Sequence, residues 1–182
     1  MHIRMEQNQD IPAIRSLIQV AFQDAPNTSH TEHLIVEALR HAHMLTISLV
    51  AEAEGRIVGH VAASPVSISS GATDWYGLGP VSVFPEKQRQ GVGSRLIEAI
   101  LAQLRKQSAA GCVVLGEPEY YQRFGFKIEP SLVLAGVPRE YFMVLSFNKD
   151  VPSGNVVYHA AFNAAWYLKA ACKQFTGRLC DA

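Results

Sequence analysis

The sequence predicts one domain of mixed α/β structure, in which antiparallel strands are followed by a long helix and then by further strands. Two segments rich in β-branched and apolar residues, 45–53 and 56–68, are joined by Glu54-Gly55 in the manner of a hairpin. The segment 91–107 carries a continuous apolar stripe at helical spacing. We therefore expect a mixed sheet of about six or seven strands with helices on both faces.

The chain is expected to begin with one strand and two helices. Residues 2–6 alternate between polar and apolar side chains as a strand does. Asp10 stands where a helix N-cap would, and apolar residues recur at helical spacing from there to about residue 24. A turn-forming run over 25–29 then precedes a second helix over 31–40.

The remaining elements complete a meander and then become shorter. The segment 75–83 is expected to form the third antiparallel strand, and the helix over 91–107 begins directly after a glycine-containing turn. The later elements predicted are a strand over 112–115, a helix from Pro118 to Gly125, extended segments over 132–135 and 141–147, and a terminal helix over 159–169.

Composition favours one compact domain without disulfides or a structural metal. The chain has 182 residues, of which 48% are hydrophobic, which is enough for a sizeable core. Its three cysteines, Cys112, Cys172 and Cys180, are an odd number without the spacing of a disulfide framework or a metal site. We therefore expect one domain over residues 1–182 in a reducing compartment.

Charge and hydropathy argue against two classes of partner. Sixteen basic residues balance sixteen acidic ones, so no net field attracts nucleic acid or an acidic membrane surface. Residues 1–10 lack the apolar centre of a signal peptide, and no stretch of about 18 uncharged apolar residues could span a bilayer. We expect a soluble cytoplasmic protein that binds neither nucleic acid nor membrane.

A glycine turn between a strand and the strongest helix is the main candidate binding element. The turn reads Gln88-Arg89-Gln90-Gly91-Val92-Gly93. Glycine lets a ligand approach the backbone, and the unpaired amides of a helix start carry partial positive charge. The pattern predicts a diphosphate cradle, although two glycines can also serve a tight turn alone. A Rossmann dinucleotide fold does not fit, because there the glycine motif follows the first strand.

The segments around this turn carry two family signatures. The first runs from Val81-Ser82-Val83 and Pro85 through Gln88-Arg89-Gln90-Gly91-Val92-Gly93-Ser94 to Leu96 and resembles the acyl-CoA-binding signature of the GNAT superfamily of N-acetyltransferases. The second, Tyr120-Tyr121-Gln122-Arg123-Phe124-Gly125-Phe126, resembles the signature in which an aromatic pair precedes Gly-Phe. The resemblance covers residues 1–147 in element order, is residue-specific only within 78–126, and leaves 148–182 as a C-terminal extension.

The resemblance implies the GNAT fold, with a central notch that holds acetyl-CoA. In such enzymes the third meander strand splays from the next parallel strand, and pantetheine pairs with the backbone in the opening. The Val81 amide would face the thioester oxygen and stabilise developing charge, while amides from Gln88 to Ser94 would hold the pyrophosphate. The implied cofactor-binding residues are Val81, Ser82, Val83, Gln88, Arg89, Gln90, Gly91, Val92, Gly93 and Ser94.

Tyr121 matches the family tyrosine that approaches the sulfur, where its phenol would protonate the departing thiolate of CoA. The alternative is an aromatic residue that only packs under the last helix. Tyr120 is expected in the core, and Arg123 is expected as a solvated helix charge, with the adenosine phosphate as the alternative ligand. Cys112 is expected to be an inert core residue, since no activating partner is evident.

The general base is left open because the sequence departs from the family pattern. Family members often carry an acid on the third meander strand, but 75–83 has none and Asp74 is the nearest. An asparagine common after the next strand is also missing. The base is therefore a water chain, Glu117, or one of Glu32, His30 and His33, although His30, His33, His41 and His43 also suit an exposed helix face without function.

The function implied is direct transfer of an acetyl group from acetyl-CoA to an amine, without a metal or a covalent enzyme intermediate. The alternative from another class is an acyl-CoA-binding sensor or interaction protein that does not turn over. Nothing in the sequence names the acceptor, so a small metabolite, an antibiotic, a peptide N-terminus and a protein lysine all stay open. A homodimer is equally compatible with the sequence.

Overall fold

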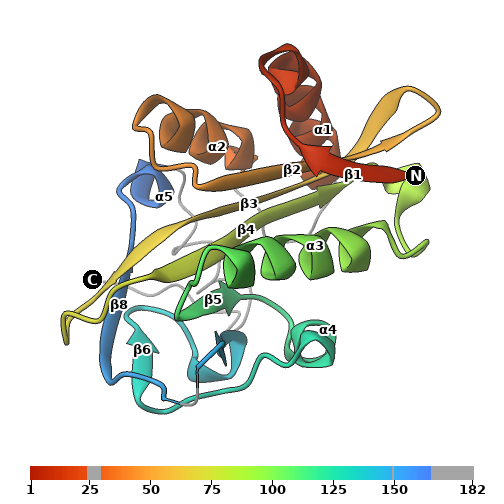
Figure 1. The fold of residues 1–182 in the computed structure, drawn as a ribbon. Helices are drawn as coiled ribbons and strands as arrows, with labels where there is room; N and C mark the ends of the chain where they lie inside the picture. Colours follow the sequence, from red (N-terminus) through yellow and green to blue (C-terminus); the bar gives the residue numbers. More distant parts are fainter. Residues whose placement is uncertain (24–29, 149, 165–182) are drawn as a thin grey trace.

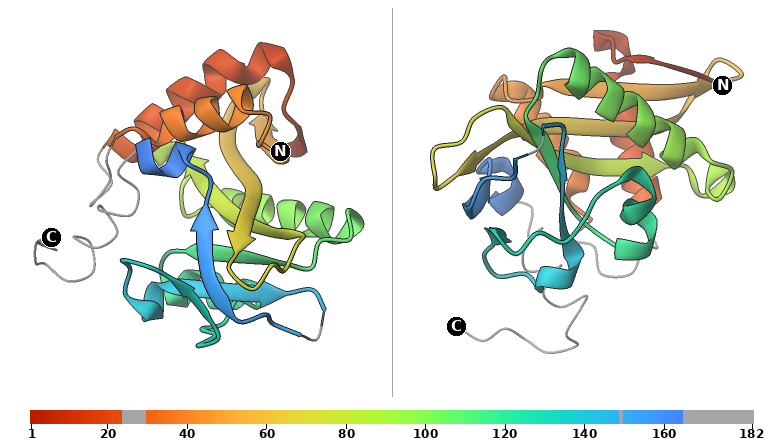
Figure 2. Two further views of the ribbon diagram at one scale, coloured as in Figure 1. Left: turned by 90° about the vertical axis from the view of Figure 1, so that its left-hand side faces the viewer. Right: turned by 60° about the horizontal axis from the view of Figure 1, so that its bottom comes forward.

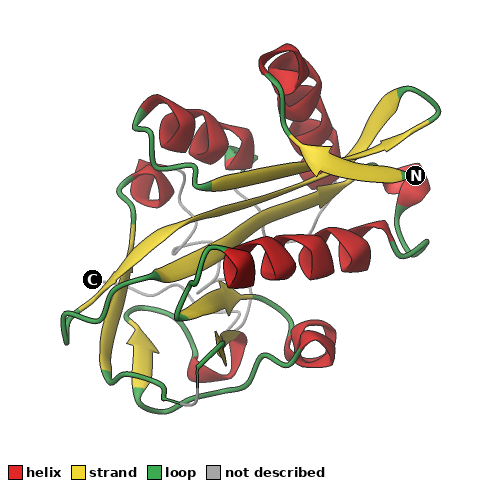
Figure 3. Ribbon diagram, viewed as in Figure 1, coloured by secondary structure: helices red, strands yellow, loops and turns green. Residues whose placement is uncertain are grey.

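The computed structural model describes residues 1–23, 30–148 and 150–164. The strands are β1 (His2–Met5), β2 (Ile47–Ala53), β3 (Arg56–Ile68), β4 (Trp75–Val83), β5 (Gly111–Leu115), β6 (Leu132–Leu134), β7 (Phe142–Ser146) and β8 (Gly154–Tyr158). The helices are α1 (Ile11–Gln23), α2 (Glu32–His41), α3 (Val92–Lys106), α4 (Pro118–Tyr121) and α5 (Ala161–Ala164). Figure 3 shows that most connections between them are short.

The strands form one mixed sheet of eight, against the six or seven expected. Its main order is β1-β2-β3-β4-β5-β7, antiparallel from β1 to β4, parallel between β4 and β5, and antiparallel again between β5 and β7. The predicted meander and its hairpin are confirmed. Glu54 and Gly55 have φ angles of 53° and 71°, the two positive values that suit a two-residue turn between twisted strands.

Helices cover both faces of the sheet, as predicted (Figures 1 and 2). On one face α3 buries its apolar stripe, including Leu96 and Ile100, against Leu49 and Val61. On the other face lie α1 and α2, and Ile14, Ile18, Val36 and Val50 form one buried cluster there. The apolar helix faces predicted from the sequence are thus buried against the sheet, with α3 on one face and α1 and α2 on the other.

Strand β8 was not predicted. It pairs antiparallel with the end of β3, where Val66 faces Tyr158, and parallel with β6. The sheet therefore includes residues beyond the segment 1–147 that the family resemblance covers. Of the terminal helix expected over 159–169, the described part is α5, and the remainder lies outside the described residues, as do Cys172 and Cys180.

Asp10 does not cap α1 in the predicted way. It ends a short 3₁₀ turn, Asn8–Asp10, just before the helix. Its carboxylate accepts the backbone N–H of Gln7 at 2.7 Å and pairs with the Arg4 guanidinium at 2.6 Å. The Arg4 guanidinium holds the pKa of the Asp10 carboxyl below its usual range. Asp10 thus fastens β1 to the start of α1.

Candidate active site

Strands β4 and β5 pair over only part of their length. The parallel register joins Trp75 to Gly111 and Gly77 to Val113, whereas β4 continues to Val83. On its other side, β4 advances from Leu78 to Val81 while β3 advances from Ala63 to Val61. Strand β4 therefore carries one extra residue, a bulge at the point where the two strands separate. This is the splay that the resemblance implies.

The backbone of Val81 and Val83 faces the side on which β5 departs. The Phe84 N–H donates to the Val58 carbonyl of β3 at 3.1 Å. Because successive residues of a strand direct their backbone groups to opposite edges, Ser82 faces β3 while Val81 and Val83 face away from it. In agreement, the Val83 carbonyl accepts a hydrogen bond from the Gln88 side chain at 3.1 Å.

A cleft of about 480 Å³ lies between this edge of β4, the start of α3 and α4. The lining residues are Val81, Val83, Gln88, Gly93, Gly116, Glu117, Tyr120 and Tyr121. Figure 1 shows α4 next to the half of α3 that follows the glycine turn. The two signatures, about 30 residues apart in the sequence, thus meet on one cleft.

The start of α3 directs unpaired amides toward this region. The first helical bond runs from the Arg95 N–H to the Gly91 carbonyl at 3.1 Å, so the amides before Arg95 lack an intrahelical acceptor. Arg89 and Gly91 have φ angles of 59° and 82°, which turn the chain sharply into the helix. The backbone N–H of Gln88 differs from those that follow it, because it donates to the Pro85 carbonyl at 3.2 Å.

Two tyrosine rings lie close against glycine backbone in the cleft. A Cβ atom at Gly93 would lie 2.8 Å from the Tyr120 hydroxyl oxygen, and one at Gly116 would lie 2.4 Å from the Tyr121 ring. The ring centroids of Tyr121 and Tyr120 lie 5.1 Å apart in an edge-to-face arrangement, which fixes the relative orientation of the two rings. Glycine at both positions therefore sets the width of the cleft.

Tyr120 and Arg123 differ from what the sequence predicted. Tyr120 is half-buried and forms a wall of the cleft, where a core position was expected. Arg123 is exposed as expected, but its guanidinium stacks 4.6 Å above the Tyr120 ring and its Nε donates to the Tyr120 carbonyl at 3.2 Å. The aromatic pair of the second signature thus lies in the cleft as a unit.

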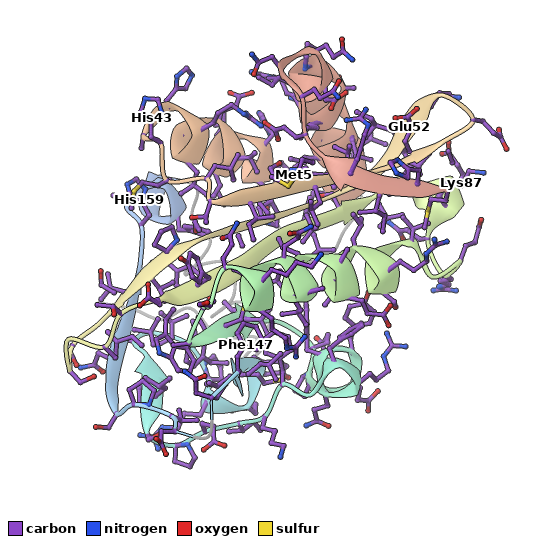
Figure 4. The ribbon with its side chains drawn as sticks, in the orientation of Figure 1. Met5, His43, Glu52, Lys87, Phe147 and His159 are labelled. Atoms are coloured by element: carbon purple, nitrogen blue, oxygen red, sulfur yellow. The ribbon has the colours of Figure 1, made fainter. Side chains whose placement is uncertain are left out.

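The candidates for the general base occupy different environments. Glu117 is exposed and lines the cleft, whereas Asp74 is exposed at the opposite end of β4 from Val81. Glu32 and His33 are buried at the start of α2, so the expectation of an exposed helix face is wrong for His33. The other histidines of that expectation, His30, His41 and His43, are exposed, and Figure 4 shows His43 pointing away from α2.

The side chain of Ser82, expected from the sequence to bind the cofactor, lies on the other face of the sheet, opposite His60, which was not predicted as a site residue. His60 on β3 and Ser82 on β4 are fully buried and are direct partners in the strand register. Burial lowers the pKa of His60 to about 4. The signal that marks this site is a histidine inside the run 57–63 of β3, whose other residues are apolar or glycine.

Three further expectations concern metal binding, Cys112 and membrane spans. Among the described residues, no three His, Cys, Asp or Glu side chains are grouped to share a metal ion, and metal independence stays a prediction. Burial raises the pKa of the Cys112 thiol well above its usual value, so Cys112 is an inert core residue. No helix within the described ranges is long and apolar enough to cross a membrane.

Comparison with known proteins supports the sequence signatures. The family described as "Acetyltransferase (GNAT) domain" matches residues 2–128. Over 129 residues the chain is 36% identical to the "Uncharacterized N-acetyltransferase YhbS" of Escherichia coli (strain K12), which covers 70% of this chain and 74% of that protein.

Two solved structures are similar over most of both chains. A GNAT family acetyltransferase from Brucella melitensis, in complex with acetyl-CoA, is 48% identical with a TM-score of 0.80, covering 88% of this chain and 97% of that one. The Escherichia coli YhbS structure, in complex with CoA, is 31% identical with a TM-score of 0.81, covering 89% and 91%. The GNAT fold predicted from the two signatures is confirmed, and the chain belongs to the GNAT family of acetyltransferases.

Proposed function

We propose that this protein transfers an acetyl group from acetyl-CoA directly to an amine. The observation that carries the proposal is the single cleft that joins three features. These are the unpaired amides at the start of α3, the outward-facing backbone of Val81 and Val83, and the Tyr121 ring. Related structures with 48% and 31% identity hold acetyl-CoA and CoA respectively.

Backbone groups around the cleft could bind separate parts of the cosubstrate. The amides from Arg89 to Ser94 would receive the pyrophosphate, favoured by the positive end of the α3 dipole. The backbone N–H of Gln88 already donates to the Pro85 carbonyl. We therefore assign Gln88 a role through its side chain, which donates to the Val83 carbonyl. Pantetheine would form hydrogen bonds with the backbone of Val81 and Val83. The Val83 carbonyl has two lone pairs, so it can accept from both the Gln88 side chain and pantetheine.

The reaction then needs one attack and one departure. The neutral amine attacks the thioester carbonyl, the C–N bond forms, and the Val81 N–H stabilises the oxyanion. As the intermediate collapses, the C–S bond breaks and Tyr121 gives its phenolic proton to the sulfur. The amine also loses a proton, which requires an acceptor. Glu117 is the carboxylate among the residues that line the cleft.

The acceptor class is tested with purified protein and acetyl-CoA by following thiol release. The panel contains spermidine as a polyamine, kanamycin as an aminoglycoside, Ala-Ala as a peptide N-terminus, and Nα-acetyl-lysine methyl ester as a protein lysine. Catalysis predicts release above hydrolysis with at least one class, accompanied by the acetylated amine in mass spectra. CoA binding without turnover of any amine would contradict the proposal and favour the sensor alternative.

A further inference from the structure

The hydroxyl of Tyr120 lies against the first turn of α3. A Cβ atom at Gly93 would lie 2.8 Å from the Tyr120 hydroxyl oxygen and 3.7 Å from a methyl carbon of Val83. Gly93 belongs to the first turn of α3, and Val83 is the last residue of β4. The hydroxyl therefore lies where the amides proposed to hold the pyrophosphate meet the strand proposed to pair with pantetheine.

Aromatic and cationic neighbours hold the Tyr120 ring in this place. The Arg123 guanidinium lies 4.6 Å from the ring centroid, while the rings of Tyr121 and Phe124 approach in edge-to-face arrangements with centroids at 5.1 Å and 5.6 Å. Two hydrogen bonds fix the backbone of the segment, from the Tyr120 N–H to the Glu117 carbonyl at 3.0 Å and from Arg123 Nε to the Tyr120 carbonyl at 3.2 Å. The ring thus presents its hydroxyl to α3 with little freedom to turn away.

This hydroxyl and the start of α3 offer hydrogen-bond donors to the same place. The amides of residues 92–94 precede the first helical bond of α3 and so lack an intrahelical acceptor. Within the described ranges, Tyr120 interacts through its ring and its main chain, and its hydroxyl forms no hydrogen bond. A phenol can donate one hydrogen bond, so donors from both helices are available to a ligand. A phosphate oxygen is the acceptor that satisfies such a set best.

The two adjacent tyrosines face different parts of the cleft. The Tyr121 ring packs on Gly116, which follows β5, and its plane is turned by 88° from that of Tyr120. Tyr121 is the residue proposed to protonate the sulfur, whereas the Tyr120 hydroxyl lies at the start of α3. The whole length of pantetheine separates the sulfur of CoA from its pyrophosphate. The two hydroxyls therefore suit opposite ends of pantetheine.

We propose that the Tyr120 hydroxyl donates a hydrogen bond to the phosphate that is attached to pantetheine, an inference that rests on the proposed acetyl transfer from acetyl-CoA. This phosphate is the junction of pyrophosphate and pantetheine, and the hydroxyl lies at the corresponding junction of α3 and β4. Arg123 is a positioning residue, because it acts through the Tyr120 ring on which it stacks. Tyr120 thereby favours thioesters that carry this phosphate over thioesters of pantetheine alone.

The contact is tested by Tyr120→Phe in the full chain, which keeps the ring and deletes the hydroxyl. We expect CoA affinity to fall about 10-fold, the lower end for a hydrogen bond to a charged group, because water replaces part of the bond. Tyr76→Phe is the matched control, since Tyr76 is a half-buried tyrosine of β4 outside the lining of the cleft. Calorimetric titration with CoA measures both variants without turnover. Unchanged affinity in Tyr120→Phe would overturn the proposal, whereas wild-type protein that failed to bind CoA would overturn the proposed function as well.

The two halves of CoA identify the phosphate. Displacement of bound CoA is measured with phosphopantetheine, which retains the phosphate on pantetheine, and with adenosine bisphosphate, which lacks it. Tyr120→Phe should weaken the binding of phosphopantetheine about as much as that of CoA and leave the binding of adenosine bisphosphate unchanged. The assignment is overturned if phosphopantetheine binds the wild type and the variant equally, or if adenosine bisphosphate loses as much affinity.

A double-mutant cycle tests the role given to Arg123. Arg123→Lys keeps the positive charge but loses the planar group that stacks on the ring, so CoA affinity should fall about threefold. In the Tyr120→Phe background the same change should have no effect, because the hydroxyl that Arg123 positions is already absent. Additive losses would mean that Arg123 contacts the cosubstrate directly and would overturn its role through Tyr120.

Discussion

The side-chain amide of Gln88 donates a hydrogen bond to the main-chain carbonyl of Val83 at 3.1 Å. This bond joins the turn that precedes α3 to the end of β4. The amides proposed to hold the pyrophosphate are thereby kept at a fixed distance from the backbone proposed to pair with pantetheine. One side chain thus organises both halves of the cleft before any ligand arrives.

Gln88→Ala is therefore expected to weaken CoA binding about fivefold, the equivalent of one neutral hydrogen bond of about 1 kcal/mol. Gln88 is exposed, so the thermal midpoint should hardly change. Calorimetric titration with CoA measures the effect. Gln107→Ala, at the exposed far end of α3, is the matched control, and equal affinity in the two variants would contradict this role.

Substitutions of the two glycines at the start of α3 are expected to change different properties, the stability of the fold at Gly91 and the affinity for CoA at Gly93. Gly91 has a φ angle of 82°, so Gly91→Ala costs about 1 kcal/mol of stability through backbone strain, although its Cβ meets nothing within 4 Å. Gly93→Val should instead displace the Tyr120 hydroxyl and fill the cleft, weakening CoA binding by about tenfold or more. Denaturant unfolding and CoA titration distinguish the two effects. Unaltered CoA affinity in folded Gly93→Val would contradict the proposed pyrophosphate site at the start of α3.

The sequence predicted most elements because their signals are local. The stripe that includes Leu96, Ile100 and Leu104 recurs at helical spacing and is buried as that spacing requires. Strand β8 escaped because it has five residues, of which only Val156 and Tyr158 are buried, and its partner β3 lies about 90 residues earlier. Such a strand is stabilised by long-range pairing, which no local pattern encodes.

The candidate site was predicted only in part, for a similar reason. Signatures locate the cleft residues because each segment carries its own turn and helix signals. The relation between His60 and Ser82 depends on the register of β3 with β4 across a bulge, and a single-residue shift would turn one of them to the other face. Likewise, the wall formed by Tyr120 follows from its approach to Gly93, which only the fold brings about.

Acetyl transfer is expected to survive dialysis against a chelator, because the proposed attack and protonation use only backbone and side-chain groups. The described residues include no group of three metal-ligating side chains. Thiol release before and after treatment, with metal content measured in parallel, checks this. Activity lost to the chelator and restored by zinc would contradict it and redirect attention to the histidines near α2.

Stability should fall as the pH drops below about 6.5, the ordinary pKa of histidine. His60 has a folded pKa of about 4, so between these values the unfolded chain binds a proton that the folded protein excludes. Its contribution is complete above pH 6.5 and is lost toward pH 4, on the order of 3 kcal/mol in all. Urea unfolding at several pH values measures this, and His60→Gln should flatten the slope.

The last prediction concerns Tyr121, which separates an enzyme from a sensor. Tyr121→Phe keeps the ring that packs against Gly116 and contacts Phe126 edge to face at 6.0 Å, so fold and CoA affinity should persist. Turnover should fall about 10²-fold, the lower end of general-acid effects, because a thiolate is a good enough leaving group to depart partly unaided.

The measurement is single-turnover acetyl transfer under conditions where chemistry limits the rate. A wild-type rate in Tyr121→Phe would remove the phenol from the mechanism and leave Tyr121 as a packing residue of the cleft wall.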